Sequence, residues 1–388
     1  MRSKLAAQAA QALRHIGQRP ASSLARSGSN AASTGPGEAP AQVIFSGIQP
    51  TGIPHLGNYL GALQQWKRLQ DGAAPDTKLL YSIVDLHAIT LPQQASNLRQ
   101  WKREMLASLL AVGLDPERSI IFYQSSVPAH AELMWILSCT ASMGYLSRMT
   151  QWKSKLSLAE DTSFLDDKAK ASLKLGLFSY PVLQAADILV HRATHVPVGE
   201  DQRQHLEFAR ECATNFNHTF GPHLIPPETI VSPAKRVMSL QQPTQKMSKS
   251  HPDPRSRILL TDTPEEIRKK IASALTDSTN AVSYDPQARP GVSNLVQLLA
   301  LFSEDNGRGP SKSPAEVAAE LEGATLKELK ARVADAVIAG IGGIRDRFYD
   351  FMQRDGGKYL DDVQERGAVR ARENSDRTMG LVRPAVGF

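Results

Sequence analysis

Short apolar runs that alternate with helical patterns constrain the fold of this chain most strongly. Three runs stand out: AQVIFSG at residues 41–47, KLLYSIVD at 78–85 and SIIFYQS at 119–125. Apolar residues recur at three- and four-residue steps from Tyr59 to Leu69, and a second helical pattern covers 97–112. Strands and helices of these lengths predict parallel βαβ units with right-handed crossovers. We therefore expect an α/β fold whose strand ends meet at one edge, where ligands bind.

Helical patterns dominate the second half of the chain. Residues 131–192 have largely helical patterns, 193–201 resemble another short strand, and helix patterns dominate beyond residue 254. Thr263 and Ser313 each precede a proline and an acid, which is typical of a helix start. We expect a Rossmann-like catalytic domain at 41–242, a lysine-rich loop at 243–254 and an all-helical domain at 255–388.

Composition excludes several classes of protein. The two cysteines are isolated, which argues against a disulfide framework or a zinc site. No run of eighteen apolar residues is present, which argues against a membrane span. The net charge is +6, but five of the 45 basic residues lie in 1–37, where no acid occurs, leaving 40 basic against 39 acidic residues. Any nucleic-acid surface must therefore be a local patch.

The first 40 residues have a pattern of their own. Leu5, Leu13 and Ile16 share one side of a helical wheel with alanines, while Lys4 and Arg14 lie on the other side. A stretch rich in Ser, Gly, Ala and Pro follows. An acid-free segment of this kind predicts a mitochondrial transit peptide. The alternative is a disordered tail that is not removed.

The loop PTQKMSKSHPDP at 243–254 places two lysines and two serines within five positions. A solvated surface turn is the simplest interpretation of such a cluster. The functional alternative is that Lys246 and Lys249 supply mobile charges to a departing polyphosphate, while Met247 anchors the loop on an apolar surface.

Glycines follow the first predicted strand in FSGIQPTGIPHLGN, residues 45–58. Gly47 and Gly57 allow backbone N–H groups to approach a phosphate, and Gln49, His55 and Asn58 add uncharged donors. Glycines after a strand often make only a tight turn, and the dinucleotide spacing G-x-G-x-x-G is absent.

HLGN followed by KMSKS resembles the paired signatures of class I aminoacyl-tRNA synthetases, with Asn58 where the first signature has a second histidine. The tryptophanyl-tRNA synthetases are the most similar family, and the resemblance runs from about Val43 into the C-terminal helices. It is carried by IFSGIQPTG, DLHAIT, QSSVPAH, RMTQWK, YPVLQAADIL, VPVGEDQRQH and KMSKS.

This resemblance implies a ligase that activates L-tryptophan with ATP and transfers it to tRNA(Trp) for translation in the mitochondrial matrix. It also implies a homodimer without membrane attachment, and Mg²⁺ held mainly by the phosphates. The residues that the resemblance assigns to catalysis are Lys246, Lys249, Lys153, His55 and Asn58. Those assigned to ATP are Gln49, His55, Leu56, Gly57, Asn58, Gly199, Glu200, Asp201, Val237, Lys246, Met247, Ser248, Lys249 and Ser250. Those assigned to tryptophan are Asp187, Tyr180, Gln202, Phe45, Gly47 and Val198.

Asp187 follows two alanines in an apolar stretch, so its carboxylate should be partly buried and needs a partner. A salt bridge or a helix cap would satisfy it. The resemblance implies instead that it accepts the indole N–H, which is a donor only. Gln184 stands where many relatives have methionine. We interpret His87 and His130 as structural or interface histidines rather than catalysts.

Glu200 and Asp201 end the strand-like VPVGED segment, where acids suit a ribose diol, although Asp201 could equally cap a helix. Other functions remain open at this point. A tyrosine-specific synthetase, a different adenylyl transferase and a non-enzymatic organellar RNA-binding or splicing factor are the alternatives. The helices after the lysine loop are the expected reader of the anticodon.

Overall fold

The computed structural model describes residues 42–156, 158, 166–167, 172–199, 202–231, 236–303 and 312–388. The predicted leader at 1–40 and the predicted ribose acids Glu200 and Asp201 lie outside the described residues. The backbone of Val198 is described, but its side chain is not.

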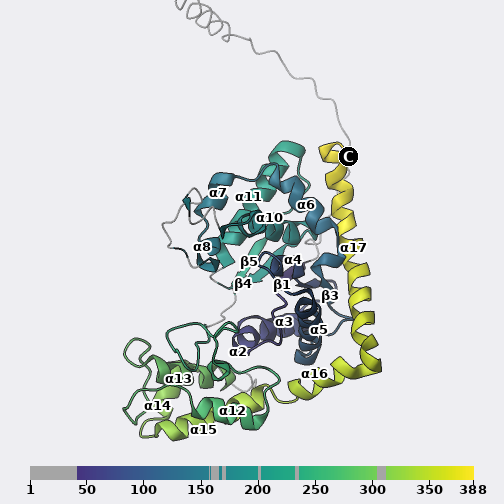
Figure 1. The fold of residues 1–388 in the computed structure, drawn as a ribbon. Coiled ribbons are helices and arrows are strands. Elements are labelled where there is room, and N and C mark those ends of the chain that lie inside the picture. Colours follow the sequence, from purple (N-terminus) through teal and green to yellow (C-terminus); the bar gives the residue numbers. More distant parts are fainter. Residues whose placement is uncertain are drawn as a thin grey trace, which may run out of the picture. The chain divides into compact units, whose positions relative to one another are not determined.

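A five-stranded parallel sheet forms the centre of the described chain (Figure 1). Its strands are β1 (Val43–Ile48), β2 (Lys78–Ile83), β3 (Ile120–Tyr123), β4 (His195–Val198) and β5 (Glu228–Val231). They lie in the order β3-β2-β1-β4-β5. The chain runs outward from β1 through β2 to β3, then returns to pair β4 with the other side of β1. The carboxyl ends of β1 and β4 therefore form the crevice where ligands bind in open α/β sheets.

Helices cover the sheet and form most of the C-terminal half (Figure 1). Up to β5 they are α2 (Leu56–Asn58), α3 (Gln64–Gly72), α4 (Asp85–Ala88), α5 (Ala95–Val112), α6 (Ala129–Ser138), α7 (Met143–Arg148), α8 (Gln151–Lys155), α10 (Leu175–Val190) and α11 (Arg203–Phe220). After β5 they are α12 (Pro264–Ala272), α13 (Pro290–Ser303), α14 (Pro314–Glu320), α15 (Leu326–Gly340), α16 (Ile344–Gln353) and α17 (Lys358–Val386). A π-helical turn at Tyr59–Leu63 joins α2 to α3, and short 3₁₀ turns lie at Gln124–Ser126, Pro254–Ser256 and Arg354–Gly357.

The two faces of the sheet belong to two apolar cores, because successive side chains of a strand point to opposite faces. Ile44 and Tyr81 join the core that includes α3 and α5. Phe45, Leu80 and Phe122 join the core that includes α6, α10 and α11. The sheet is therefore buried on both sides, which explains why its strands read as nearly continuous apolar runs.

Helix α17 covers β3, which is an edge strand of the sheet (Figure 1). Gly367 lies against the backbone of Ile121, and a Cβ at this glycine would come within 1.8 Å of the Ile121 carbonyl oxygen. The absence of a side chain thus lets the helix approach the strand directly. Leu360 of α17 belongs to one apolar core and Met379 to the other, so the helix contributes to both faces.

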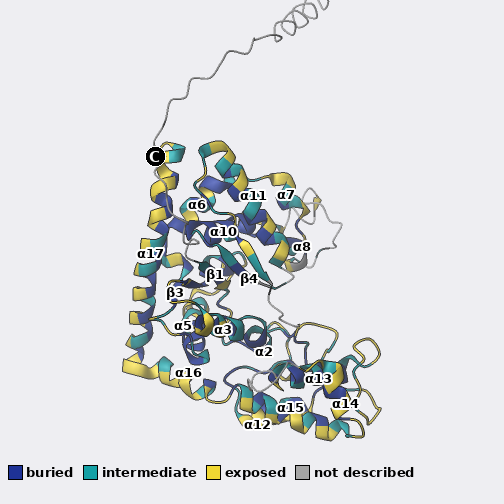
Figure 2. Cartoon of the chain, turned by 180° about the vertical axis from the view of Figure 1, so that it is seen from behind, coloured by how far each residue is buried: buried dark blue, intermediate teal, exposed yellow. Residues whose placement is uncertain are grey.

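Helices α12 to α15 pack mainly on one another, with buried inner and exposed outer residues (Figure 2). The predicted starts at Thr263 and Ser313 are confirmed, because both side chains accept a hydrogen bond from the third helical residue in a capping box. The helix pattern that the sequence shows from 325 to 353 is divided into α15 and α16, because Gly343 adopts a φ of 74°.

The predicted parallel α/β architecture followed by helices is confirmed, including the strand within 193–201. Sequence analysis missed β5, whose four residues lie in a segment bounded by prolines. No helix in the described parts of the chain has the length and hydropathy needed to span a bilayer.

Candidate active site

A cavity of about 820 Å³ lies at the carboxyl ends of β1 and β4. Among its lining residues are eleven that the sequence predicted for the site: Phe45, Gly47, Gln49, Gly57, Asn58, Tyr180, Asp187, Gly199, Gln202, Val237 and Lys246. Lys246 and Asp187 come from segments 59 positions apart and share this cavity. One cavity thus contains both a cation of the lysine loop and the buried acid.

The lysine loop lies against the glycine-containing turn after β1. Met247 is 2 % exposed and packs beside Gly57, where a Cβ would lie 3.8 Å from the Met247 Cβ. Lys249 Nζ donates hydrogen bonds to the backbone oxygens of Thr51 at 3.1 Å and Gly52 at 2.6 Å. Burial lowers the pKa of Lys249 from 10.5 to about 7. Lys249 is therefore docked on the turn beside the cavity, and its charge is sensitive to pH.

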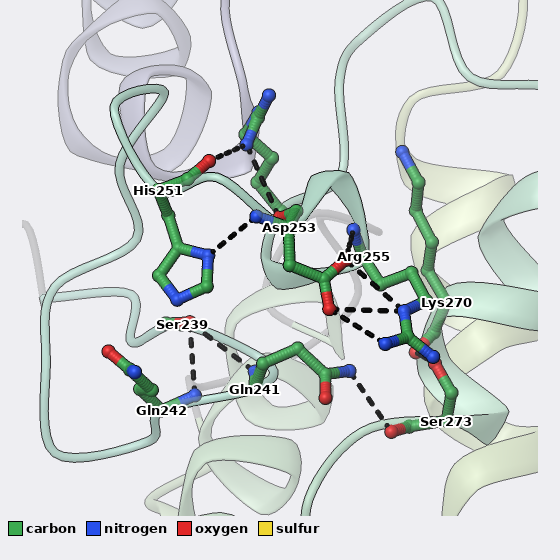
Figure 3. Close-up of polar contacts among 9 residues, drawn as sticks. Ser239, Gln241, Gln242, His251, Asp253, Arg255, Lys270 and Ser273 are labelled. Atoms are coloured by element: carbon green, nitrogen blue, oxygen red, sulfur yellow. Dashed lines mark hydrogen bonds and ion pairs between the residues drawn. The ribbon is translucent and has the colours of Figure 1, made fainter.

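Both ends of the lysine loop are held by local hydrogen bonds (Figure 3). His251 Nδ1 accepts from the backbone N–H of Asp253 at 3.1 Å, and Arg257 donates to the His251 carbonyl at 2.9 Å. On the other side, Ser239 Oγ accepts from the backbone N–H of Gln242 at 3.1 Å. These contacts hold the residues at the start and at the end of the lysine loop in place.

His55 caps the short helix α2 and is 5 % exposed. Its Nδ1 accepts from the backbone N–H of Asn58 at 3.3 Å, and Asn58 Oδ1 accepts from the His55 backbone at 3.1 Å. Burial, together with the charges of Lys249 and Lys246, lowers the pKa of His55 to about 3. His55 is consequently a neutral imidazole at physiological pH, with its proton on Nε2.

Asp187 is 1 % exposed and accepts three hydrogen bonds from distant segments. His87 Nε2 lies 2.8 Å from Oδ2, while Gln124 Nε2 and His130 Nδ1 lie 2.6 and 2.7 Å from Oδ1. Burial alone would raise the pKa of Asp187, but hydrogen bonds from His130 and His87 outweigh this effect and lower the pKa to about 2. The acid is therefore an anion, and His87 and His130 are buried partners of it rather than interface residues.

Lys155 lines the cavity, whereas the cavity lining does not include Lys153, the lysine that sequence analysis named. Lys155 Nζ lies 4.4 Å from the ring centroid of Tyr180, and burial lowers the pKa of Lys155. Lys153 is 8 % exposed, with Nζ 5.6 Å from the Trp152 ring centroid. The Tyr180 hydroxyl lies 3.0 Å from His205 Nε2, and burial raises the pKa of Tyr180, which keeps the phenol neutral.

Several other predicted residues lie near the cavity without lining it. They are His55, Leu56, Met247, Ser248, Lys249 and Ser250. Leu56 is fully buried core, and Ser248 and Ser250 share a hydrogen bond of 2.8 Å within the loop. Gln202 Oε1 accepts a hydrogen bond of 3.4 Å from Gln184, the residue that departs from the family pattern.

Sequence analysis missed four lining residues with useful chemistry: Lys155, Arg236, Gln151 and His205. Lys155 is two positions from Lys153, the residue that sequence analysis named, and lies in the same segment. Arg236 lies just before the predicted Val237. Gln151 and His205 lie within the family segments RMTQWK and VPVGEDQRQH, but sequence analysis did not single them out.

Lys246, Lys155 and Arg236 line the cavity as cations, and Asp187 lines it as a buried anion. Such a site suits a ligand that carries both a polyphosphate and an N–H donor. Across the described ranges, no cluster of three or more His, Cys, Asp or Glu side chains is placed to hold a metal ion.

Comparison with known proteins places these features in a family. The family model of class I tRNA synthetases for tryptophan and tyrosine matches residues 39–340. The mitochondrial tryptophan–tRNA ligases of Schizosaccharomyces pombe and Saccharomyces cerevisiae are each 43% identical over 352 residues. These matches cover 89% of this chain, and 95% and 90% of the two yeast proteins.

Solved structures agree with the sequence relatives. The tryptophanyl-tRNA synthetase of Mycoplasma pneumoniae superposes with a TM-score of 0.76 at 31% identity, covering 90% of this chain and 98% of that one. The Campylobacter jejuni enzyme complexed with ADP and tryptophan gives a TM-score of 0.70 at 29% identity, covering 89% and 100%. The chain therefore belongs to the class I tRNA synthetases of the tryptophan and tyrosine group.

Proposed function

We propose that this protein is a tryptophan–tRNA ligase, which forms tryptophanyl-adenylate and pyrophosphate from L-tryptophan and ATP and then charges tRNA(Trp). The observation that supports it best is the environment of Asp187. An ionised carboxylate has about four acceptor positions, and the described residues use three of them. One position therefore remains in the wall of the cavity for a donor such as the indole N–H.

The positions of the other side chains suit adenylate formation. The tryptophan carboxylate attacks the α-phosphate of ATP in line and expels pyrophosphate, so negative charge grows on the leaving group. Lys246, Lys155 and Arg236 are the cations of the cavity that would stabilise this charge. Lys249 would join them by leaving the carbonyls of Thr51 and Gly52, since phosphate oxygens are stronger acceptors.

His55 and Asn58 act in this proposal as uncharged donors at the start of α2. The Nε2–H of His55 would donate to a phosphate oxygen, because its Nδ1 already accepts from the backbone. A neutral histidine contributes no proton to the leaving group, so it binds and orients the polyphosphate. Mg²⁺ would be held mainly by the phosphate oxygens, since the donors here are mostly cations and amides.

Recognition of the indole N–H, and rejection of phenylalanine, rest on the same acid. The indole nitrogen only donates, so its partner must be an acceptor. A substrate without any donor would leave the buried carboxylate with an unfilled position, which sites of this type reject strongly. Phe45 and Gly47 line the adjoining wall, and Tyr180 and Gln202 would bind the ammonium group.

Binding of tRNA is assigned to the helices after the lysine loop. Their candidate cations are engaged by neighbours: Arg268 pairs with Asp335 at 2.8 Å, and Lys269 pairs with Glu265 at 2.7 Å. Lys330 donates to the Ala274 carbonyl at 2.8 Å. We therefore assign the anticodon to this region as a whole and to no single residue. We also propose that the catalytic domain ends at residue 242 and that the helical, tRNA-binding domain begins after residue 254.

The two yeast relatives are named as mitochondrial enzymes, which supports a mitochondrial location for this chain. Together with the acid-free cationic leader, they support import into the matrix and removal of a transit peptide. A homodimer is proposed as well. Trp135 on α6 is 69 % exposed and Met143 on α7 is 59 % exposed, which makes this face a candidate interface.

An ATP–pyrophosphate exchange assay with each standard amino acid, followed by charging of tRNA(Trp), tests the proposal. We expect exchange with tryptophan alone. Faster exchange with tyrosine would overturn the assigned specificity. Exchange without tRNA charging would indicate another adenylyl transferase, and RNA binding without exchange would indicate a non-enzymatic RNA-binding factor.

A further inference from the structure

Four side chains of α10 and α11 form a closed cluster in one wall of the cavity. Tyr180 and Gln184 lie one turn apart on α10. Gln202 and His205 lie three positions apart at the start of α11. Gln184 Nε2–H donates to Gln202 Oε1 at 3.4 Å, which joins the two helices at one point. The Tyr180 hydroxyl, 3.0 Å from His205 Nε2, joins them at a second point. All four side chains line the cavity.

This cluster presents uncharged acceptors to the cavity. A carboxamide oxygen has two lone pairs, so Gln202 Oε1 keeps one of them after it accepts from Gln184. Gln184 is half-buried, and no described residue donates to its Oε1, which remains accessible. The Tyr180 oxygen can accept as well when its hydroxyl hydrogen points to His205 Nε2. Three oxygens are thus open to a donor.

Three acceptor oxygens match the α-ammonium group of an amino acid. Like the ammonium of a lysine, this group has three N–H donors and no lone pair. A hydrogen bond from a charged donor is also stronger than one from a neutral donor. A carboxylate or a phosphate only accepts, so the same three oxygens would repel it. The chemistry of the cluster therefore selects a cationic donor.

Gln184 lies between Tyr180 and Asp187 on one face of α10. It is four positions after Tyr180 and three before Asp187, and all three side chains line the cavity. The rise of a helix places Gln184 about 6 Å along the axis from Tyr180 and about 4.5 Å from Asp187. An amino acid whose indole N–H reaches Asp187 would extend along this face, with its ammonium group at Gln184 and Tyr180.

Lys155 is a second cation at Tyr180. Its Nζ lies 4.4 Å from the ring centroid, over the face of the phenol rather than at the hydroxyl. The proposed function assigns Lys155 to the polyphosphate, and rotation toward the phosphates would separate the two positive charges. The three oxygens of the cluster therefore remain for the substrate.

We propose that Gln184 is a further tryptophan-binding residue: its Oε1 accepts a hydrogen bond from the α-ammonium group, and its Nε2–H turns the oxygen of Gln202 toward the same group. This inference rests on the proposed function and deepens it. A methionine side chain of similar length would offer only a weak sulfur acceptor and no N–H donor. Gln184→Met therefore removes both contacts while it keeps most of the side chain's volume.

Three indole compounds separate the contacts that the substrate makes. Tryptophan carries an ammonium and a carboxylate, tryptamine lacks the carboxylate, and indole-3-propionate lacks the ammonium, while all three keep the indole N–H. Exchange kinetics give KM for tryptophan and for ATP, with the other two compounds measured as competitive inhibitors. The variants are Gln184→Met, Gln202→Leu and their combination. Gln64→Met is the matched control, because the cavity lining does not include Gln64 of α3. Thermal unfolding of each variant reports stability separately.

We expect Gln184→Met to raise KM for tryptophan and the inhibition constant of tryptamine about tenfold, the lower range for a hydrogen bond to a charged group. The inhibition constant of indole-3-propionate and KM for ATP should not change. Gln64→Met should change none of these constants. Because Gln184 orients Gln202, the double variant should lose less than the product of the two single losses.

Equal weakening of all three compounds in Gln184→Met would show that the side chain only shapes the pocket, and weakening of none would show that it makes no contact. Either result overturns the proposal. Independent losses in the double variant would overturn the orienting contact with Gln202. Absence of tryptophan-dependent exchange in the wild type would instead overturn the proposed function, and this inference with it.

Discussion

The docked position of Lys249 predicts proton uptake when a polyphosphate binds. Burial against the Thr51 and Gly52 carbonyls lowers the pKa of Lys249 to about 7 in the free protein. An adjacent polyphosphate favours the charged form and raises the pKa again. At pH 8 about a tenth of Lys249 is charged before binding, so binding should take up about 0.9 proton per site. At pH 6 the same calculation gives about 0.1 proton.

Isothermal titration calorimetry with pyrophosphate measures this uptake when each titration is repeated in two buffers of different ionisation enthalpy. Pyrophosphate itself exchanges protons, so the informative quantity is the difference between wild type and Lys249→Arg. Arginine keeps its charge throughout this range and serves as the matched control. Equal proton uptake by the two proteins at pH 8 would show that Lys249 is already charged in the free protein, contrary to the desolvation of its position.

Three further outcomes are expected. Gly367→Ala should lower the free energy of unfolding in urea by about 1–3 kcal/mol, because the new methyl group meets the β3 backbone; Gly380→Ala on the same helix, with open space around it, should not, and equal effects would argue against the close contact. Lys155→Met should reduce kcat/KM for exchange at least about tenfold, because Lys155 lines the cavity; a larger loss in Lys153→Met would reverse this assignment. His55 has a pKa of about 3 when folded and 6.5 when unfolded, so the unfolded state binds more protons between these values and stability falls as pH drops. By pH 4 this should cost about 3 kcal/mol in urea unfolding relative to pH 7, and His55→Gln should lose clearly less.

The first three strands and the starts of two helices were predictable because their signals are local. The apolar runs that became β1, β2 and β3 are continuous, since both faces of the sheet are buried. Thr263 carries its helix signal within four residues. By contrast, β5 is a short run, and only its pairing with β4 makes it a strand.

The candidate site was predictable where a motif carried it and not where distant segments met. Lys246, His55 and Asp187 each stand in a recognisable stretch of sequence. Gln124 and His130 reach Asp187 across 63 and 57 positions, so their partnership depends on tertiary packing that no local pattern expresses. The same limit explains why sequence analysis interpreted His87 and His130 only as structural or interface residues and did not find their contacts with Asp187.

The contact between Asn374 of α17 and His191 spans 183 positions of the chain. Because a ribosome makes the chain from its amino end, every strand of the sheet is synthesised long before the helix that completes the surroundings of Asp187. A nascent chain can fold its sheet early, yet the contacts that run from Asn374 through His191 and His130 to Asp187 form only when α17 has emerged and docked on β3. A message truncated shortly before Asn374 would therefore yield a protein with both signature motifs intact but without the outermost of these contacts.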